Sequence, residues 1–281
     1  MKEDPRIILI QNDINKGALY TKSKGVLNAK GKYVMTLDKD DLYANEKSFS
    51  ILYEEAEKNN LDILGFSAIQ GDMGDKFYTK NFHNYFETSV IYQPELSERS
   101  ILKSKSGKII GQRDVLWAYF FKTELYIKTI KEIDDKILNR IINNCDDIIV
   151  FFLLVRRATS LKHIKNIFYV TIHKNSIQNP LIRFSNEEKQ KKRKKYDCLG
   201  YLSYVEFVFQ KTKNNFEEKK FASFEMNNYL LKKKCFENEI YRKKEVLEVF
   251  ELFLKNEYID NKLKNKIHKY INKINEKYLN L

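Results

Sequence analysis

Apolar runs and amphipathic stretches alternate along the first part of the chain. Arg6 to Ile10 and Tyr33 to Leu37 are continuous apolar runs, which predict strands buried on both faces. Between them, residues 17–29 place apolar side chains on one side and lysines on the other. This pattern predicts a helix, with Gly31 just beyond its end.

The same rhythm continues with a predicted helix over residues 46–59 and a predicted strand over residues 61–66. A β-α-β-α-β order implies right-handed crossovers, so we expect a mostly parallel sheet with helices on its faces. Residues 69–106 contain turn residues and scattered aromatics, which predict loops and one short hairpin. The expected fold class is therefore α/β.

Three helices and a strand are predicted in the next part of the chain. Residues 114–130 and 136–142 have helical character, and residues 148–157 are so apolar that a buried helix is expected. Residues 166–171 are typical of a strand. A polar turn, closed by Pro180, follows them.

Beyond Pro180 apolar residues recur at three- and four-residue spacing, which predicts helices. We therefore expect two regions, an α/β domain over residues 1–180 and a mainly helical region over residues 181–281. Charge also separates them. The net charge is +13, and residues 181–281 hold 24 of the 51 Lys and Arg but only 15 of the 38 Asp and Glu.

The run Lys189 to Lys195 concentrates this basic character. Such a run binds phosphate groups or an anionic membrane surface, or it is simply a solvated helix face or linker. It contains no interleaved aromatic residue, so base stacking is not indicated and nucleic acid is not expected as a partner. Peripheral contact with a membrane remains as the functional interpretation.

Cysteine use and the lengths of the apolar runs favour a cytoplasmic protein. The three cysteines are widely spaced and odd in number, as expected for free thiols in a reducing compartment. The N-terminus has no apolar signal-peptide core. The strongest apolar run, Ile148 to Val155, is far shorter than the about 20 residues that span a bilayer.

The first candidate site is the cluster Asp38-Lys39-Asp40-Asp41, directly after the predicted strand of residues 33–37. In open α/β sheets, ligands bind beyond the carboxyl ends of the strands. Carboxylate oxygens suit Mg²⁺ or Mn²⁺, and Asp at alternate positions can direct two of them toward one ion. Asp also favours turns and helix N-termini, so Asp40 or Asp41 could instead cap the next helix.

The second candidate is the pair Asp146-Asp147 at the start of the apolar helix. Acidic residues in a first helical turn ordinarily complement the helix dipole. A partly desolvated carboxylate also makes a good general base, because desolvation raises its pKa. His173, in a polar turn, is either structural or a ligand contact. Trp117 lies in an aromatic cluster that suits a core or, when exposed, a sugar ring.

Taken in order, these segments resemble glycosyltransferase family 2 enzymes, which have the GT-A fold. The resemblance extends over about residues 6–178. The matching segments are Asn12 to Gly17 (similar to N-x-G), Lys22 to Gly25, Ala29 to Tyr33, Leu37 to Asp41 (similar to LD-x-DD), Cys145 to Asp147 (similar to the ED motif) and Tyr169 to Ser176 (similar to Y…H..S).

The resemblance implies a metal-dependent enzyme that moves a sugar from a nucleotide-diphosphate donor to an acceptor hydroxyl with inversion. The acceptor would be a carbohydrate or a lipid-linked molecule. The implied site residues are Asp147 as base with Asp146 beside it, Asp38, Asp40 and His173 at a Mn or Mg ion, and Asn15, Gly17, Lys22 and Asp38 at the nucleotide-sugar.

The sequence departs from the family pattern in two ways. It contains neither the P-x-Y-N nor the DDGS segment, so the resemblance implies a GT-A domain that lacks its N-terminal nucleoside-binding segment and leaves its sheet incomplete. Lys22 replaces the family's arginine and supplies charge without a bidentate guanidinium. The alternative function is a non-catalytic, glycosyltransferase-like module for binding or assembly.

Overall fold

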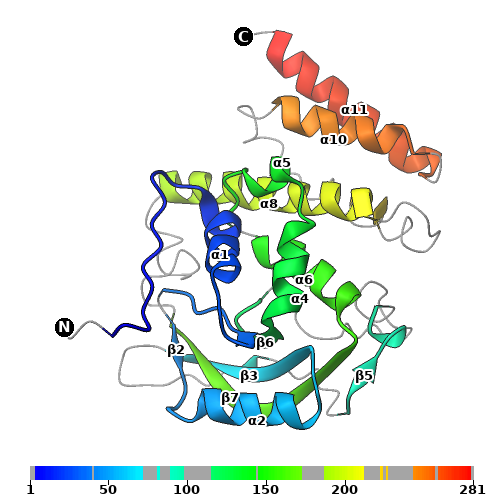
Figure 1. Cartoon of the computed structure of the whole chain (residues 1–281). Helices are drawn as coiled ribbons and strands as arrows, with labels where there is room; N and C mark the ends of the chain where they lie inside the picture. The colour runs from blue at the N-terminus through cyan, green and yellow to red at the C-terminus, as the bar shows by residue number, and fades with distance from the viewer. Residues whose placement is uncertain are drawn as a thin grey trace.

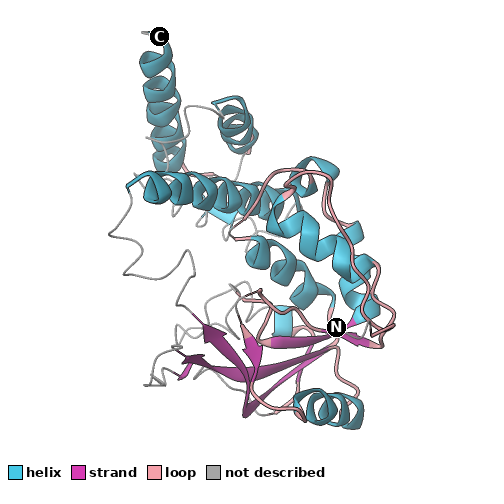
Figure 2. Cartoon of the chain, turned by 90° about the vertical axis from the view of Figure 1, so that its left-hand side faces the viewer, coloured by secondary structure: helices cyan, strands magenta, loops and turns pink. Residues whose placement is uncertain are grey.

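The structure, a computed structural model, has layers of helices stacked on one sheet (Figures 1 and 2). Helix α2 covers one face of the sheet, and the helices α1, α4 and α6 cover the other. The C-terminal helices lie beyond that second layer. The described residues are 4–39, 41–71, 81–82, 89–97, 115–143, 145–172, 187–211, 222–223, 226, 243–256 and 259–279.

The sheet has the strand order β1-β6-β3-β7-β2, with β4 beside β3 and β5 beside β7. The central pair β3–β7 is parallel, and the other described pairs are antiparallel. The α/β class is confirmed, with a mixed sheet where a mostly parallel one was predicted. The strands are β1 (Tyr33–Val34), β2 (Leu42–Tyr43), β3 (Ile63–Gly71), β4 (Asn81–Phe82), β5 (Ile91–Tyr92), β6 (Tyr119–Lys122) and β7 (Ser160–Ile172).

The helical C-terminal region and the buried helix that follows Asp146 are confirmed. Helix α8 packs against α6, and α10 packs against both α8 and α11. The predicted boundary at residue 180 falls outside the described residues and stays a prediction. The helices are α1 (Gly17–Leu27), α2 (Ser48–Lys58), α4 (Thr123–Lys131), α5 (Asp135–Leu138), α6 (Asp146–Arg157), α8 (Glu187–Lys211), α10 (Lys243–Leu254) and α11 (Asn261–Leu279).

Helix α6 lies inside the protein, packed against α4 and α8. Residues 149–155 are all buried there, as expected of a helix that is apolar on every side. The first residues of α6, Asp146 and Asp147, are buried with it. In the described part of the chain, no helix combines the length and the apolar character needed to cross a bilayer.

Two predicted buried strands are wrong in whole or in part. Residues 6–10 form no strand, and Ile7, Ile8 and Leu9 are 77%, 62% and 88% exposed. Of residues 33–37 only Tyr33 and Val34 are paired, with β6 on one side. A continuous apolar run therefore does not by itself predict a buried strand. Burial also requires neighbouring strands, which the run does not specify.

The predicted helix of residues 114–130 is also wrong in its first half. Tyr119 to Lys122 form β6, which lies between β1 and β3 and buries its aromatic side chains on both faces. Aromatic residues favour such a position in a sheet. Helix α1 ends at Leu27, where the backbone N–H of Asn28 bonds to Gly25 and Val26, so Gly31 does not close it.

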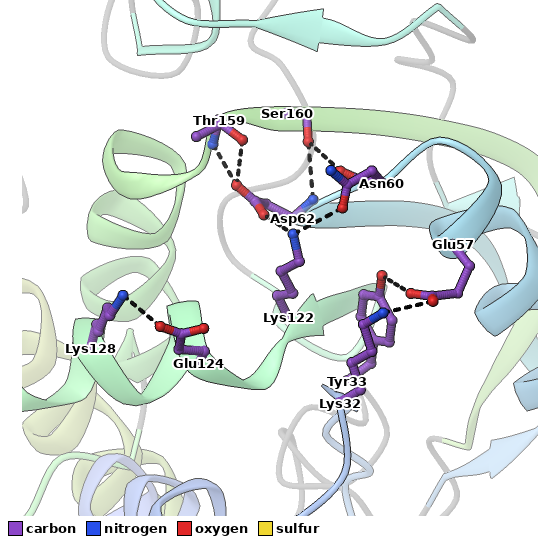
Figure 3. A network of polar contacts seen from close by, with 10 residues as sticks. All are labelled: Lys32, Tyr33, Glu57, Asn60, Asp62, Lys122, Glu124, Lys128, Thr159 and Ser160. Carbon is purple, nitrogen blue, oxygen red and sulfur yellow. Dashed lines mark hydrogen bonds and ion pairs between the residues drawn. The ribbon is translucent and has the colours of Figure 1, made fainter.

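A polar network ties together the ends of three strands (Figure 3). Asp62, 8% exposed, precedes β3, and its carboxylate accepts hydrogen bonds from Lys122 Nζ (2.9 Å) and from the Thr159 N–H and hydroxyl (2.7 Å each). The Asp62 N–H donates to Ser160 Oγ (3.1 Å). Burial would raise the pKa of Asp62, but these donors outweigh it and lower that pKa.

Candidate active site

Four of the predicted site residues meet around the ammonium group of Lys22. Its Nζ lies 3.0 Å from Asp147 Oδ1, 3.1 Å from Asp146 Oδ2 and 3.4 Å from Asp38 Oδ1. Lys22 comes from α1, Asp38 from the loop after β1, and the other two carboxylates from the start of α6. The two acidic motifs, which are far apart in the sequence, therefore converge on one cation.

The start of α1 is anchored to the segment that precedes α6. The Ile142 carbonyl accepts hydrogen bonds from the N–H groups of Ala18 (2.7 Å) and Leu19 (3.2 Å), which belong to the first turn of α1. Gly17 has φ +83°, and a Cβ there would lie 2.6 Å from the Ile142 nitrogen. Only glycine fits this approach, and it brings Lys22 over the start of α6.

Asn15 and Gly17, predicted to contact the donor, shape this turn. The side-chain oxygen of Asn15 accepts a hydrogen bond from the Gly17 N–H at 2.9 Å. Among the described residues, the contacts of the Lys22 ammonium are with Asp38, Asp146 and Asp147, whereas Asn15 and Gly17 bond to each other. Their contact with a donor stays a prediction.

Asp147 is held from two sides at the start of α6. Lys22 Nζ donates to its Oδ1, and the Leu116 N–H donates to its Oδ2 at 3.1 Å. Cys145, two residues before Asp147, has φ +63°, a left-handed conformation that is unusual for a residue with a side chain. Strained backbone of this kind is frequent at functional sites.

The electrostatics of this cluster favour a proton on Asp147 near neutral pH. Burial raises the pKa of Asp147 and the neighbouring Asp146 raises it further, to about 8, although Lys22 acts in the opposite direction. Burial would lower the pKa of Lys22, but the carboxylates around it outweigh this and hold that pKa well above its usual value. Three carboxylates share one ammonium, so the cluster has a surplus of negative charge.

Tyr169 of β7 holds the acidic loop that contains Asp38. Its hydroxyl accepts a hydrogen bond from the Asp38 N–H (3.1 Å) and donates to Asp41 Oδ2 (2.8 Å). Trp117 stacks on the Tyr169 ring, with centroids 4.6 Å apart, and is only 8% exposed, as its core interpretation predicts. Asp41 does not cap the next helix, because α2 begins at Ser48.

The roles of Tyr169 and Leu116 were missed by the sequence reasoning. Tyr169 carried a weak signal, because it opens a segment noted for its resemblance to the family. The contribution of Leu116 is a backbone N–H, which any residue except proline supplies, so the sequence contains no signal for it.

The predicted metal site is described only in part. Asp40 and His173 lie outside the described residues. The carboxylate of Asp38 is 43% exposed and 3.4 Å from Lys22, and Asp41 is engaged by Tyr169. In the part of the chain that the structure describes, no three His, Cys, Asp or Glu side chains are grouped so as to hold a metal ion.

Residues 1–124 match the family model described as "Glycosyl transferase family 2". The chain is 29% identical over 125 residues to "Uncharacterized glycosyltransferase EpsJ" of Bacillus subtilis (strain 168), a match that covers 44% of this chain and 34% of that protein. It is 26% identical over 132 residues to "Putative colanic acid biosynthesis glycosyl transferase WcaA" of Escherichia coli (strain K12), a match that covers 47% of this chain and 44% of that protein. These matches span less than half the length of either relative.

The fold is similar to that of a solved crystal structure. Residues 1–349 of S. aureus TarS, solved in complex with UDP, superpose with a TM-score of 0.50 at 10% sequence identity, over 95% of this chain and 72% of that one. A likeness over 95% of this chain extends well beyond the residues of the family match. Residues 1–124 are thus similar to glycosyltransferase family 2, and the chain as a whole has a GT-A-like fold.

Proposed function

We propose that the chain is the catalytic part of a glycosyltransferase that moves a sugar from a nucleotide-diphosphate donor to an acceptor hydroxyl with inversion. The convergence of Asp38, Asp146 and Asp147 on Lys22 carries this proposal. Three carboxylates around one largely buried ammonium are unfavourable for folding, which argues for a functional reason. The donor class is supported by TarS, which was solved with UDP.

Asp147 is the base in the proposed reaction. The acceptor oxygen attacks the anomeric carbon on the face opposite the diphosphate, and the bond to the diphosphate oxygen breaks. The diphosphate leaves with the electron pair, and Asp147 accepts the proton of the acceptor hydroxyl. Asp147 acts as the base in its deprotonated form, which is the main form above about pH 8 and the minor form at neutral pH. A pKa of about 8 makes that form a stronger proton acceptor than an ordinary carboxylate. The Leu116 N–H and Lys22 fix its carboxylate, whose oxygens retain further lone pairs.

A divalent Mn or Mg ion is assigned to Asp38, Asp40 and His173, and when bound it neutralises charge on the leaving diphosphate. Binding of Mn²⁺ alone, measured by electron paramagnetic resonance, tests the assignment without any turnover. We expect Asp40→Ala to bind Mn²⁺ at least about tenfold more weakly than the wild type. Equal binding by Asp40→Ala would remove Asp40 from the ligand set, and Asp135→Ala, an exposed carboxylate of α5, is the control.

The decisive experiment measures release of free nucleoside diphosphate from UDP- and GDP-sugars in the presence of Mn²⁺. Asp147→Asn should lower the rate by roughly 10²- to 10⁴-fold, because it removes the proton acceptor. Asp135→Asn should be unaffected. If wild type and Asp147→Asn release diphosphate equally fast, Asp147 has no part in the mechanism.

The same samples test the alternative of a non-catalytic module. Such a module would release no diphosphate beyond the uncatalysed rate, yet it would bind a nucleotide-sugar in a Mn²⁺-dependent way by calorimetry. Catalysed release in the wild type that is lost in Asp147→Asn excludes this alternative.

Contact with an anionic membrane surface is a second proposal, favoured by the surface of α11. Its buried side is formed by Leu263 and Ile267. Lys262, Lys269 and Lys273 are exposed on the opposite side, at spacings that place them along one face of the helix. Lysines near an anionic bilayer contribute about 1 kcal/mol each at low salt. A lipid-linked acceptor would be reached from such a surface.

Sedimentation with vesicles tests this contact. The triple variant in which these three lysines become Gln should bind vesicles containing phosphatidylglycerol roughly 100-fold more weakly at low salt. A matched triple variant that neutralises the exposed Lys30, Lys47 and Lys131 removes the same charge elsewhere and should bind normally. If the wild-type protein does not sediment with anionic vesicles at low salt, the proposal is overturned.

A further inference from the structure

A buried ion pair joins the C-terminal helix α8 to the segment that precedes α6. Arg140 and Glu206 are 7% and 4% exposed, and Arg140 Nη1 lies 2.6 Å from Glu206 Oε2. The same nitrogen donates to Ser203 Oγ at 2.8 Å. Apolar residues of similar volume often serve stability as well as a buried pair does. The pair therefore calls for an explanation beyond holding α8 against that segment.

The ion pair fixes the short segment that anchors α1. Arg140 is two residues before Ile142, and the Ile142 N–H donates to the Arg140 carbonyl at 2.8 Å. The Ile142 carbonyl in turn accepts the hydrogen bonds from Ala18 and Leu19. The guanidinium of Arg140 thus holds the backbone on which the first turn of α1 rests.

That segment also leads directly into α6. Cys145, with its left-handed backbone, is three residues beyond Ile142, and Asp146 and Asp147 follow at once. The segment 140–142 is therefore attached to α1, which carries Lys22, and to α6, which carries the two carboxylates. Lys22 lies 3.1 Å from Asp146 and 3.0 Å from Asp147, between the two helices that this segment joins.

We infer that Arg140 is a positioning residue for the Lys22–Asp147 contact, and that Glu206 of α8 keeps it in place. The C-terminal region then supports the active site by fixing its geometry. Lys136 extends the connection to α10, since its Nζ lies 2.7 Å from Glu248 and 4.0 Å from Glu206. This inference rests on the proposed function where it concerns catalysis, but its structural part can be tested without turnover.

Three variants separate positioning from folding. Glu206→Gln removes the charge that holds Arg140 and keeps the shape of the side chain. The double variant Arg140→Met/Glu206→Leu replaces the pair by apolar residues and is expected to fold even if Glu206→Gln does not. Glu132→Gln is the control, because it breaks another Arg–Glu pair, the exposed contact of Glu132 with Arg157 at the far end of α6.

Amide hydrogen exchange in the folded protein, read by NMR, is the test that needs no activity. In Glu206→Gln and in the double variant, the Ala18 and Leu19 amides should exchange at least about tenfold faster. The Leu61 amide, which bonds to the Ala56 carbonyl at 2.9 Å, should keep its wild-type rate. Unchanged exchange at Ala18 and Leu19 in the double variant would overturn the inference, whether or not the chain transfers sugar.

Diphosphate release then tests the catalytic part. The double variant should lower kcat about 10- to 100-fold, because the contact between Lys22 and Asp147 is loosened. The KM for the donor should rise as well, because Gly17 and Lys22, both predicted donor contacts, belong to the same helix α1. Glu132→Gln should leave both unchanged. A double variant with faster Ala18 exchange and wild-type kcat would show that the position of α1 does not matter for the reaction, and the inference would fail.

Discussion

Asp62 and Asp147 are both nearly buried aspartates that contact a lysine, yet their pKa values shift in opposite directions. Asp62 receives hydrogen bonds from Lys122 and, twice, from Thr159. Asp147 receives one from Lys22 and one from a backbone N–H, and it lies beside a second carboxylate that shares the same lysine.

The comparison shows that burial alone does not decide the state of a carboxylate. Around Asp62 the donors match the acceptor, so the charged form is stable and the group serves the fold. Around Asp147 two more carboxylates compete for one ammonium, so a proton is held strongly. A carboxylate with too few hydrogen-bond donors around it binds a proton strongly, which suits a general base. A carboxylate with enough donors stays charged, which suits a structural network.

The largest expected effect on stability comes from breaking the Asp62 network. Asp62→Asn leaves Lys122 beside an amide and turns one acceptor into a donor that faces Thr159. We expect the free energy of unfolding to fall by about 2–4 kcal/mol, measured by urea denaturation. Diphosphate release per folded molecule should not change, and Asp135→Asn should be neutral. A loss below about 0.5 kcal/mol would contradict the role given to Asp62.

Gly17→Ala should disturb only the network around Asp147. The added Cβ meets the Ile142 backbone, and φ +83° is unfavourable for alanine, so a loss of about 1–3 kcal/mol is expected together with a lower kcat. Gly25→Ala in the same helix is the control. Nothing lies within 4 Å of a Cβ at position 25, so that variant should gain up to about 1 kcal/mol. Equal effects at both positions would contradict the anchoring role of Gly17.

The two aspartates should impose opposite pH dependences on stability. The pKa of Asp62 is lowered on folding, so its contribution is present above the unfolded value near 3.8 and is lost as pH falls. The pKa of Asp147 is raised from 3.8 to about 8, so the folded state binds the extra proton in that window and stability declines as pH rises through it.

Denaturation curves at several pH values between about 4 and 8 check this difference. Asp147→Asn should show a smaller decline with rising pH than the wild type, by at most about 1.4 kcal/mol per pH unit. Asp62→Asn should keep the wild-type decline over the same window. Parallel curves for wild type and Asp147→Asn would show that Asp147 is not protonated preferentially in the folded protein.

The smallest effect is expected from Thr159→Val. This change removes the hydroxyl that donates to Asp62 but keeps the backbone N–H that donates to the same oxygen. A loss of about 1 kcal/mol is expected from denaturation, clearly less than for Asp62→Asn. If both variants lose equally, the hydroxyl rather than the ion pair with Lys122 dominates the network.

Much of the fold follows from periodicity. Helices α1, α2 and α6 lie close to their predicted places because each has an apolar face or core that a helix can bury. Strand β6 and the exposed residues 6–10 were mispredicted, because the burial of a short apolar or aromatic run depends on partners distant in sequence. The direction of most strand pairs depends on the same long-range contacts.

The site was predictable in its residues but not in its geometry. The acidic motifs and Lys22 could be found from their order along the chain. Their meeting at one ammonium group depends on Gly17 resting against Ile142, which no local pattern encodes. The contact of the Leu116 N–H and the Arg140–Glu206 pair could not be predicted from the sequence either. The first is made by a backbone group, and the second joins two regions that are far apart in the chain.

The parallel pair β3–β7 has a consequence for how the chain folds. It aligns residues 63–71 with residues 161–172, so a long intervening segment must be in place before the centre of the sheet can close. A polypeptide that stops at residue 124 would contain β3 and β6 but would lack β7, leaving an open and largely apolar strand edge. On a ribosome, the central sheet therefore assembles only after β7 has emerged. The segment that matches the family model, residues 1–124, is therefore shorter than the part of the chain that closes the central sheet.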